Sequence, residues 1–291
     1  MGKRVIVDFD NTMGVRGCDV DDGLALLYLL GCPDVQVEGI CTTYGNNKLD
    51  VVHANTLHLV EEWGLDVPVY RGGEFGSAPE GNEAARFIAD ATRKDPEQVS
   101  VIATGSMTNL GCARDLDPDA LNRAEGLYLM GGITESLVIN GHIMDELNLS
   151  CDARAARATL SAACPVHVAT AQNCMPAFFS KDDLERTFGS DSWMTRTCAY
   201  WFSDMEDAYL WDGWVCWDVV TAAYAVHPEL FEDAPFNVTL NETLLGVGYL
   251  ERAREGAPAA RINAPVIKNP AAFKQNVLTA WKRAVDRLGL D

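Results

Sequence analysis

Short apolar runs rich in β-branched residues alternate along the chain with longer segments of helical periodicity. The predicted strands are residues 5–7, 35–43, 99–104, 127–130 and 166–169. The predicted helices are residues 24–30, 51–62, 110–114 and 153–163. This alternation is typical of a mainly parallel sheet with helices on both faces. We therefore predict an α/β fold with a Rossmann-like open sheet.

The C-terminal third of the chain predicts an addition to the edge of this sheet. Residues 236–250, FNVTLNETLLGVGYL, alternate like a late β-hairpin with Asn241 and Glu242 in the turn. A closing helix is expected at residues 271–288. No linker rich in Ser, Gly or Pro and no internal repeat divides the chain. The expectation is a single domain over residues 1–291.

Charge and cysteine content narrow the range of partners. The 42 acidic residues against 23 basic ones give a net charge of −19, which repels phosphate backbones and anionic lipids. Nucleic acid and membrane are therefore not expected as partners. The start, MGKRVIVDFD, has too short an apolar run for a signal peptide, so we expect a cytoplasmic protein. Nine cysteines without a C-x-x-C pair indicate free thiols rather than disulfides or a zinc site.

A dense group of carboxylates follows the first predicted strand. It comprises Asp8, Asp10, Asp19, Asp21 and Asp22. Carboxylates confined between a strand and a helix repel one another unless a cation or the helix N-terminus compensates them. A hard divalent ion such as calcium takes such oxygen ligands. The alternative is that Asp21 and Asp22 cap the following helix and the others are solvated.

Polar residues also follow the later strands, where ligands of open α/β sheets bind. Asn46 comes after the second strand in CTTYGNN, although a Gly-Asn pair is often only a turn. Thr104 ends the third long strand and can offer its backbone carbonyl to an ion. Asp218 opens an apolar helical pattern after Trp217, where a helix cap is the simpler explanation.

The loop after the fourth of these strands carries a further polar group, NGHIMDELN. Its candidate residues are Asn140, Glu146 and Asn148, placed before a helix that Asp152 can cap. Amides and a carboxylate on one loop suit a polyhydroxylated ligand such as a sugar, and an ordinary surface loop has the same composition.

Taken in this order, the segments resemble the calcium-dependent nucleoside hydrolases. The resemblance rests on the D-x-D…D-D start, T-T-x-G-N, T-G-x-x-T-N, M-G-G, N-x5-E-x-N and the late aromatic-Asp pair, from Asp8 to about Phe231. It implies hydrolysis of the N-glycosidic bond of a ribonucleoside to ribose and free base. Members of this family are commonly dimers or tetramers, so the resemblance also implies a homodimer or homotetramer.

The resemblance assigns roles to individual residues. It implies a Ca²⁺ ion held by Asp10, Asp22, the carbonyl of Thr104 and Asp218. Asp10 also matches the general base that takes a proton from a calcium-bound water, and Asn46 matches a residue beside the attacked carbon. The residues that match ribose-binding groups are Asp21, Asn140, Glu146 and Asn148.

Two departures from the family pattern change the picture. Residues 11–20 form a longer loop than usual, which Gly14 and Gly17 allow to fold back. Trp217 replaces the His that protonates the leaving base in the inosine-uridine-preferring type. A Trp cannot donate a proton as an acid, but it stacks on purines. We therefore predict a preference for purine nucleosides. Trp217 and Trp211, which lie in an aromatic-rich segment, are expected to line the pocket for the base.

Two other functions start from the same residues. D-F-D-N-T resembles the opening motif of haloacid-dehalogenase-like phosphatases, with Asp8 as nucleophile and magnesium as cofactor. That reading leaves Asp21, Asp22 and the Trp-Asp pair unexplained. The other alternative is a non-catalytic calcium- or sugar-binding protein on the same fold.

Overall fold

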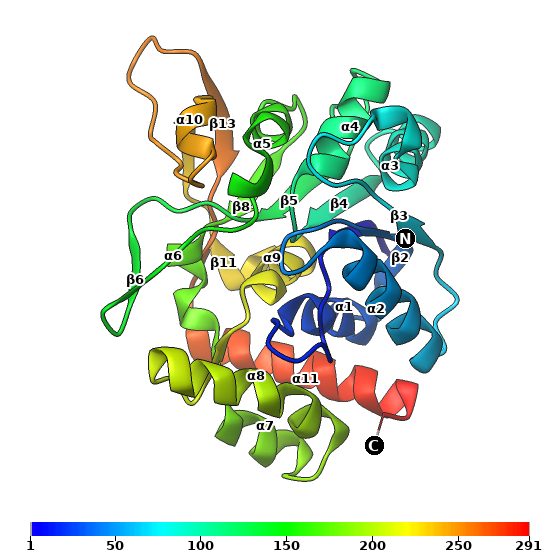
Figure 1. Cartoon of the computed structure of the whole chain (residues 1–291), viewed down its shortest axis with the longest axis vertical. Helices are drawn as coiled ribbons and strands as arrows, with labels where there is room; N and C mark the ends of the chain where they lie inside the picture. Colours follow the sequence, from blue (N-terminus) through cyan, green and yellow to red (C-terminus); the bar gives the residue numbers. More distant parts are fainter. Residues whose placement is uncertain (1, 291) are drawn as a thin grey trace.

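A computed structural model describes residues 2–290, and an eight-stranded sheet runs through its middle (Figure 1). Across the sheet the strands are β12 (Pro235–Thr239), β13 (Ala259–Asn263), β8 (Val166–Ala169), β5 (Gly126–Met130), β4 (Val99–Ala103), β1 (Lys3–Phe9), β2 (Val35–Thr42) and β3 (Val69–Arg71). Only the pair of β12 and β13 is antiparallel. The predicted mainly parallel α/β fold is confirmed.

Helices cover both faces of the sheet (Figure 1). One face carries α3 (Glu83–Lys94), α4 (Thr108–Leu116) and α5 (Ala153–Leu160). The other carries α1 (Asp21–Gly31), α2 (Leu49–Glu62), α9 (Trp217–Val226) and α11 (Pro270–Leu288). Strand β1 feeds both cores, because successive side chains point to opposite faces. Val5 and Val7 lie in one core and Ile6 in the other.

The remaining elements lie around the carboxyl ends of the strands or close the edges. They are the hairpin of β6 (Leu137–Ile139) and β7 (His142–Met144), α6 (Ala171–Cys174), the pair β9 (Phe178–Ser180) and β10 (Gly213–Val215), α7 (Lys181–Phe188), α8 (Trp193–Tyr209), α10 (Glu242–Leu245), and the pair β11 (Phe231–Glu232) and β14 (Val266–Ile267). Short 3₁₀ helices connect several of them.

The predicted late hairpin exists, but its second strand was placed wrongly. β12 does join the edge of the sheet, yet its antiparallel partner is β13 rather than the residues just after Asn241. The Asn241 side chain accepts the backbone N–H of Thr243 at 2.9 Å and starts helix α10 instead of a turn. Asn is a strong helix cap as well as a turn former, and here capping prevails.

Two expectations from composition can be compared with the structure. All nine cysteines are free, and only Cys18 and Cys151 are partly exposed, which confirms the expected free thiols. Within residues 2–290, no helix combines the length and the apolar character that crossing a bilayer requires.

Helix α11, which confirms the closing helix expected near the C-terminus, packs directly against α1. A Cβ atom at Gly31, the last residue of α1, would collide with the carbonyl oxygen of Ala280. Arg283 also donates to the Gly31 carbonyl at 2.9 Å. The indole Nε1 of Trp281 donates to the carbonyl of Leu24 at 2.8 Å. These contacts hold α1 in place, and α1 carries the Asp21-Asp22 pair at its other end.

Gly31→Ala tests this packing. Ala normally stabilises a helix relative to Gly, but here the added methyl overpacks the α1–α11 contact, so we expect a loss of about 1–3 kcal/mol of unfolding free energy. Urea denaturation measures it. Gly81→Ala is the matched control, because a Cβ there meets nothing within 4 Å. Equal stability of the two variants would show that α11 can shift to accommodate the methyl group without loss of unfolding free energy.

Candidate active site

The site lies where the strand order reverses. β1 pairs with β2 on one side and with β4 on the other. The chain runs from β1 through β2 to β3 at one edge, and then continues from β4 toward the other edge. In open α/β sheets this reversal leaves a crevice beyond the carboxyl ends of the strands. Three predicted site residues lie there: Asp10 after β1, Asn46 after β2 and Thr104 after β4.

Asp10 is fully buried under close-packed backbone. A Cβ at Gly45 would collide with its Oδ2, and one at Gly105 would lie 2.9 Å from its Oδ1, so both positions need glycine. The backbone N–H of Asn46 donates to Oδ2, whereas Oδ1 has no hydrogen-bond partner. A buried acceptor without a donor costs about 1–3 kcal/mol. Oδ1 is therefore available to an ion or a water.

Three further aspartates converge beside it from two helix starts. One carboxylate oxygen each of Asp21, Asp22 and Asp218 lies within 4.8 Å of the others. The N–H of Asp218 donates to Asp21 Oδ2 at 3.2 Å, so Asp21 caps α9 rather than its own helix. Asp22 accepts hydrogen bonds from Thr104 Oγ1 at 2.8 Å and from Asn46 Nδ2 at 3.2 Å.

Burial and mutual repulsion set the electrostatics of this cluster. Burial raises the pKa of Asp10, and it raises the pKa values of Asp22 and Asp218 well above their usual range. The charges of neighbouring aspartates, Asp21 among them, raise all three further. The N-termini of α1 and α9 favour negative charge and offset part of this cost. The cluster therefore binds protons unless a cation supplies the opposite charge.

The donor set fits a hard divalent cation. The grouped carboxylates of Asp21, Asp22 and Asp218 leave out the predicted ligand Asp10, whose Oδ1 has no hydrogen-bond partner. Asn46 donates to both Asp10 and Asp22, and the Thr104 carbonyl accepts from Asn148 Nδ2 at 2.7 Å. Calcium and magnesium take oxygen ligands of this kind. The structure groups the predicted ligands Asp22 and Asp218 and adds Asp21, which the resemblance assigned to ribose. The ligand set and the identity of the ion stay predictions.

A cavity of about 230 Å³ opens beside the carboxylates. Its polar lining includes the predicted residues Asp21, Asn46, Glu146, Asn148 and Asp218. Glu146 is held in place by backbone N–H groups of Gly132, Leu149 and Ser150, at 2.8 to 3.0 Å. A rigid carboxylate facing a cavity is suited to orient a polar ligand.

Asn140 does not lie in this cavity. It is exposed at the tip of the β6–β7 hairpin, with φ of 48°, and its Nδ2 donates to the Tyr209 carbonyl at 2.6 Å. The left-handed backbone of a tight turn accounts for an Asn at this position. The geometry therefore gives no support to its predicted contact with ribose.

Aromatic rings form a second part of the cavity lining, called here the tryptophan wall. The lining includes Trp201 and Tyr209 from α8, Trp214 from β10 and Trp217 from α9. Trp214 packs edge-to-face against Trp201 at 5.2 Å and against Trp217 at 5.7 Å between ring centroids. Trp217 lines the cavity next to Asp218 in the chain, and its contact with a base stays a prediction.

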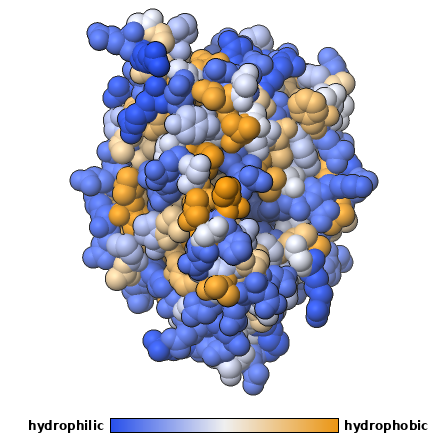
Figure 2. Space-filling view, turned by 60° about the vertical axis from the view of Figure 1, so that its left-hand side comes forward, coloured by the Kyte–Doolittle hydropathy of each residue, from blue (hydrophilic) through white to orange (hydrophobic). Residues whose placement is uncertain are grey.

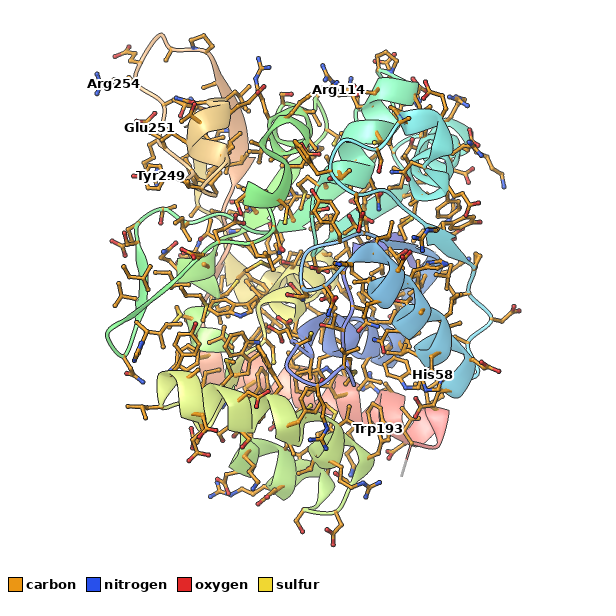
Figure 3. All side chains as sticks on the ribbon, viewed as in Figure 1. His58, Arg114, Trp193, Tyr249, Glu251 and Arg254 are labelled. Atoms are coloured by element: carbon orange, nitrogen blue, oxygen red, sulfur yellow. The ribbon has the colours of Figure 1, made fainter. Side chains whose placement is uncertain are left out.

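Two other tryptophans of the same segment lie outside the wall. Trp211 packs behind Trp214, 5.9 Å away between centroids, and does not line the cavity, so its predicted base contact lacks geometric support. Trp193 lies at the far end of α8 (Figure 3) and packs edge-to-face on Trp63 at 5.9 Å.

The sequence reasoning missed several lining residues. Asp19 was counted among the carboxylates but received no role, and the thioethers of Met130, Met144 and Met205 were not considered. Asp19 could have been found from its position in the long loop just before the Asp21-Asp22 pair. Nothing in the local sequence marks the methionines, which are ordinary core residues by composition.

Exposed apolar surface lies next to the cavity, whose lining includes Leu137, Met144 and Leu147. Val138 and Ile143 of the β6–β7 hairpin, with Leu147 and Val247 nearby, are exposed. Figure 2 shows hydrophobic surface gathered in the middle of the face that carries this hairpin. A two-stranded hairpin is only marginally stable by itself, so its contacts at Leu137 and Ile139 with the core hold it over the cavity.

Comparison with known proteins agrees with this geometry. The model of the inosine-uridine preferring nucleoside hydrolase family matches residues 5–275. The chain belongs to this family and is a nucleoside hydrolase, as the sequence motifs predicted. The phosphatase and non-catalytic alternatives are not favoured.

Individual relatives are named for different substrates. A probable uridine nucleosidase from Arabidopsis thaliana is 28% identical over 53% of this chain and 54% of its own length. A pyrimidine-specific ribonucleoside hydrolase from Citrobacter koseri is 26% identical over 72% of this chain and 77% of its own. The structure of a purine-preferring ribonucleoside hydrolase from Gardnerella vaginalis superposes with a TM-score of 0.81 and 22% identity, over 97% of this chain and 99% of that one.

The carboxylate cluster predicts stabilisation by calcium. Protein treated with a chelator should melt at a higher temperature once Ca²⁺ is added, because a ligand at about 100 times its Kd adds about 2.7 kcal/mol. Differential scanning fluorimetry measures the shift, with Mg²⁺ in parallel.

Asp22→Asn should lose most of this shift, although its ion-free form melts no lower than wild type because one repelling charge is gone. Asp34→Asn, with the same charge change on an exposed residue, should keep the shift. A full shift in Asp22→Asn would place the ion elsewhere.

Proposed function

We propose that this protein hydrolyses ribonucleosides to ribose and free base, with calcium as its cofactor and a preference for purines. The observation that carries the proposal is one cavity lined both by carboxylates of the buried cluster and by the tryptophan wall. Glycoside hydrolysis passes through a state with positive charge on the sugar, which such carboxylates favour.

The residues that would hold the ion are Asp10, Asp22, the Thr104 carbonyl and Asp218. When bound, a divalent cation supplies Lewis-acid activation of water and a counter-charge for the carboxylates. Asp10 is the proposed general base. Its buried carboxylate has a raised pKa and a free Oδ1, and both suit a group that accepts a proton from water.

The remaining polar groups orient the sugar. Asp21, Glu146 and Asn148 lie along the cavity and are proposed to bind the ribose hydroxyls, with Asn46 beside the attacked carbon. The oxygen of water bonds to that carbon as its bond to the base nitrogen breaks, and the base gains one proton. Fixed orientation of this kind contributes several kcal/mol to catalysis, about 7–11 kcal/mol at best.

The purine preference rests on Trp217. Its indole lines the cavity next to Asp218 and offers a stacking surface where an imidazole would offer a proton. Purine ring nitrogens take a proton from water more readily than uracil does. The names of the relatives cover uridine, pyrimidine and purine nucleosides, so they do not decide this point.

The wider setting is also proposed. Residues 1–291 are taken as one nucleoside hydrolase domain that works in the cytoplasm as a homodimer or homotetramer. Size-exclusion chromatography with light scattering reports the number of subunits.

Release of reducing sugar from inosine and guanosine by purified protein tests the activity. It should stop when a chelator is added and return with Ca²⁺. Asp10→Asn should lower kcat by about 10²- to 10⁴-fold, the usual contribution of a general base. Unchanged rates in Asp10→Asn would remove this residue from the chemistry.

Trp217→His tests the preference for purines. An imidazole restores a proton donor, so the kcat/KM ratio of uridine to inosine should rise by at least about tenfold. Trp211→His, one ring behind the wall, should leave the ratio unchanged. Comparable turnover of uridine and inosine by the wild-type enzyme would refute the preference.

A further inference from the structure

The cavity is strongly acidic. Among the described residues that line it, none is Lys, Arg or His, whereas the carboxylates comprise Asp19, Asp21, Asp145, Glu146 and Asp218. Figure 3 shows Arg114 and Arg254 at the opposite end of the view from Trp193 of α8. Asp19 and Asp145 are additional to the residues proposed for the ion and the ribose, so their negative charge needs another explanation.

Asp19 lines the cavity just before Asp21, whose N–H it accepts at 3.2 Å. The long loop that carries it docks on α8, where the Tyr200 hydroxyl accepts the N–H of Gly14 at 2.9 Å. Asp19 lines the same cavity as Trp201, Met205 and Tyr209 of α8. Asp19 therefore brings a carboxylate to the aromatic side of the cavity, where the base would bind.

The rings of the tryptophan wall are steeply inclined to one another and do not form one flat surface. The planes of Trp201 and Trp214 differ by 79°, and those of Trp214 and Trp217 by 80°. Rings at right angles can present faces to one ligand from more than one direction. Indole faces attract cations more strongly than other side-chain rings do. Polarisable thioethers of Met130, Met144 and Met205 complete the lining.

A base that already carries a positive charge also removes the need for an acid. A neutral base must gain a proton when it leaves, and the lining contains no imidazole or ammonium to supply one. In a cationic N-riboside, the oxygen of water bonds to the sugar carbon while the carbon–nitrogen electron pair returns to the ring. The base departs neutral, and the proton of water passes to Asp10.

We infer that this cavity is adapted to N-ribosides whose base is cationic, such as 7-alkylpurinium or pyridinium nucleosides, with Asp19 and the tryptophan wall recognising the charge. The inference rests on the proposed function, because it assumes that the base binds at this wall. Asp19 acts here as a specificity residue rather than a catalytic one.

Binding of uncleavable base analogues separates charge recognition from leaving-group ability. The probes are 7,9-dimethylguaninium against 9-methylguanine and 1-methylnicotinamide against nicotinamide, followed by tryptophan fluorescence of the calcium-loaded protein. Within each pair the cation should bind about 3- to 30-fold more tightly, the range from an exposed to a desolvated cation–π contact.

The test variant is Asp19→Asn, which retains an Oδ1 for the N–H groups of Val20 and Asp21 that Asp19 now accepts at 2.6 and 3.2 Å. It should weaken binding of the cations by about threefold or more and leave the neutral analogues unchanged. Asp204→Asn, an exposed charge on the same helix α8, should change neither. Equal affinities within both pairs, or unchanged cation binding in Asp19→Asn, would overturn the inference.

Turnover distinguishes this inference from the proposed function. Rates for 7-methylguanosine, nicotinamide riboside and guanosine are each divided by the uncatalysed rate. A larger rate enhancement for either cationic riboside than for guanosine supports the inference. It also shows whether the purinium or the pyridinium compound is preferred. Hydrolysis of guanosine without such an advantage, and without preferential binding, overturns the inference and leaves the proposed function standing. No hydrolysis of any nucleoside overturns the proposed function itself.

Discussion

Repulsion among buried carboxylates is the constraint on which the rest of this structure depends. Asp10, Asp21, Asp22 and Asp218 are all at most 4% exposed, and their charges oppose one another. Folding places them together only because α1 and α9 are anchored from behind, through Gly31 against α11 and through the cores on the sheet. The glycines over Asp10 then leave no room for relaxation. The repulsion lowers the stability of the folded protein, and a bound cation would offset it.

Much of the fold could be predicted because strands buried on both faces and amphipathic helices differ in period. Strand β3 was not predicted, since Val69–Arg71 is too short to show a period. Helix α3 was not predicted either. Helix α8 was seen only as an aromatic segment. Its residues have modest helix propensity, so tertiary packing determines that this segment is helical. The late hairpin failed for another physical reason, because Asn241 serves helix caps as readily as turns.

The candidate site was predicted as far as strand ends reveal it. Asp10, Asn46 and Thr104 each follow a strand of the same sheet, so topology alone brings them together. Side chains on irregular segments are different, because their direction depends on contacts that no local pattern records. Asn140 points to α8 instead of the cavity, and Trp211 lies behind Trp214. Asp19 enters the site through a loop whose path depends on Tyr200, 186 residues away from its partner Gly14.

The hydrogen bond between Asp21 and the backbone of Asp218 joins positions 197 residues apart in the chain. An N-terminal fragment that ends before α9 has the first carboxylates of the proposed metal site but not the last, Asp218. Closing so long a loop is slow, and binding energy reaches folding only at its final stage. A cation held by the proposed ligands would therefore stabilise only chains in which α9 has packed beside α1.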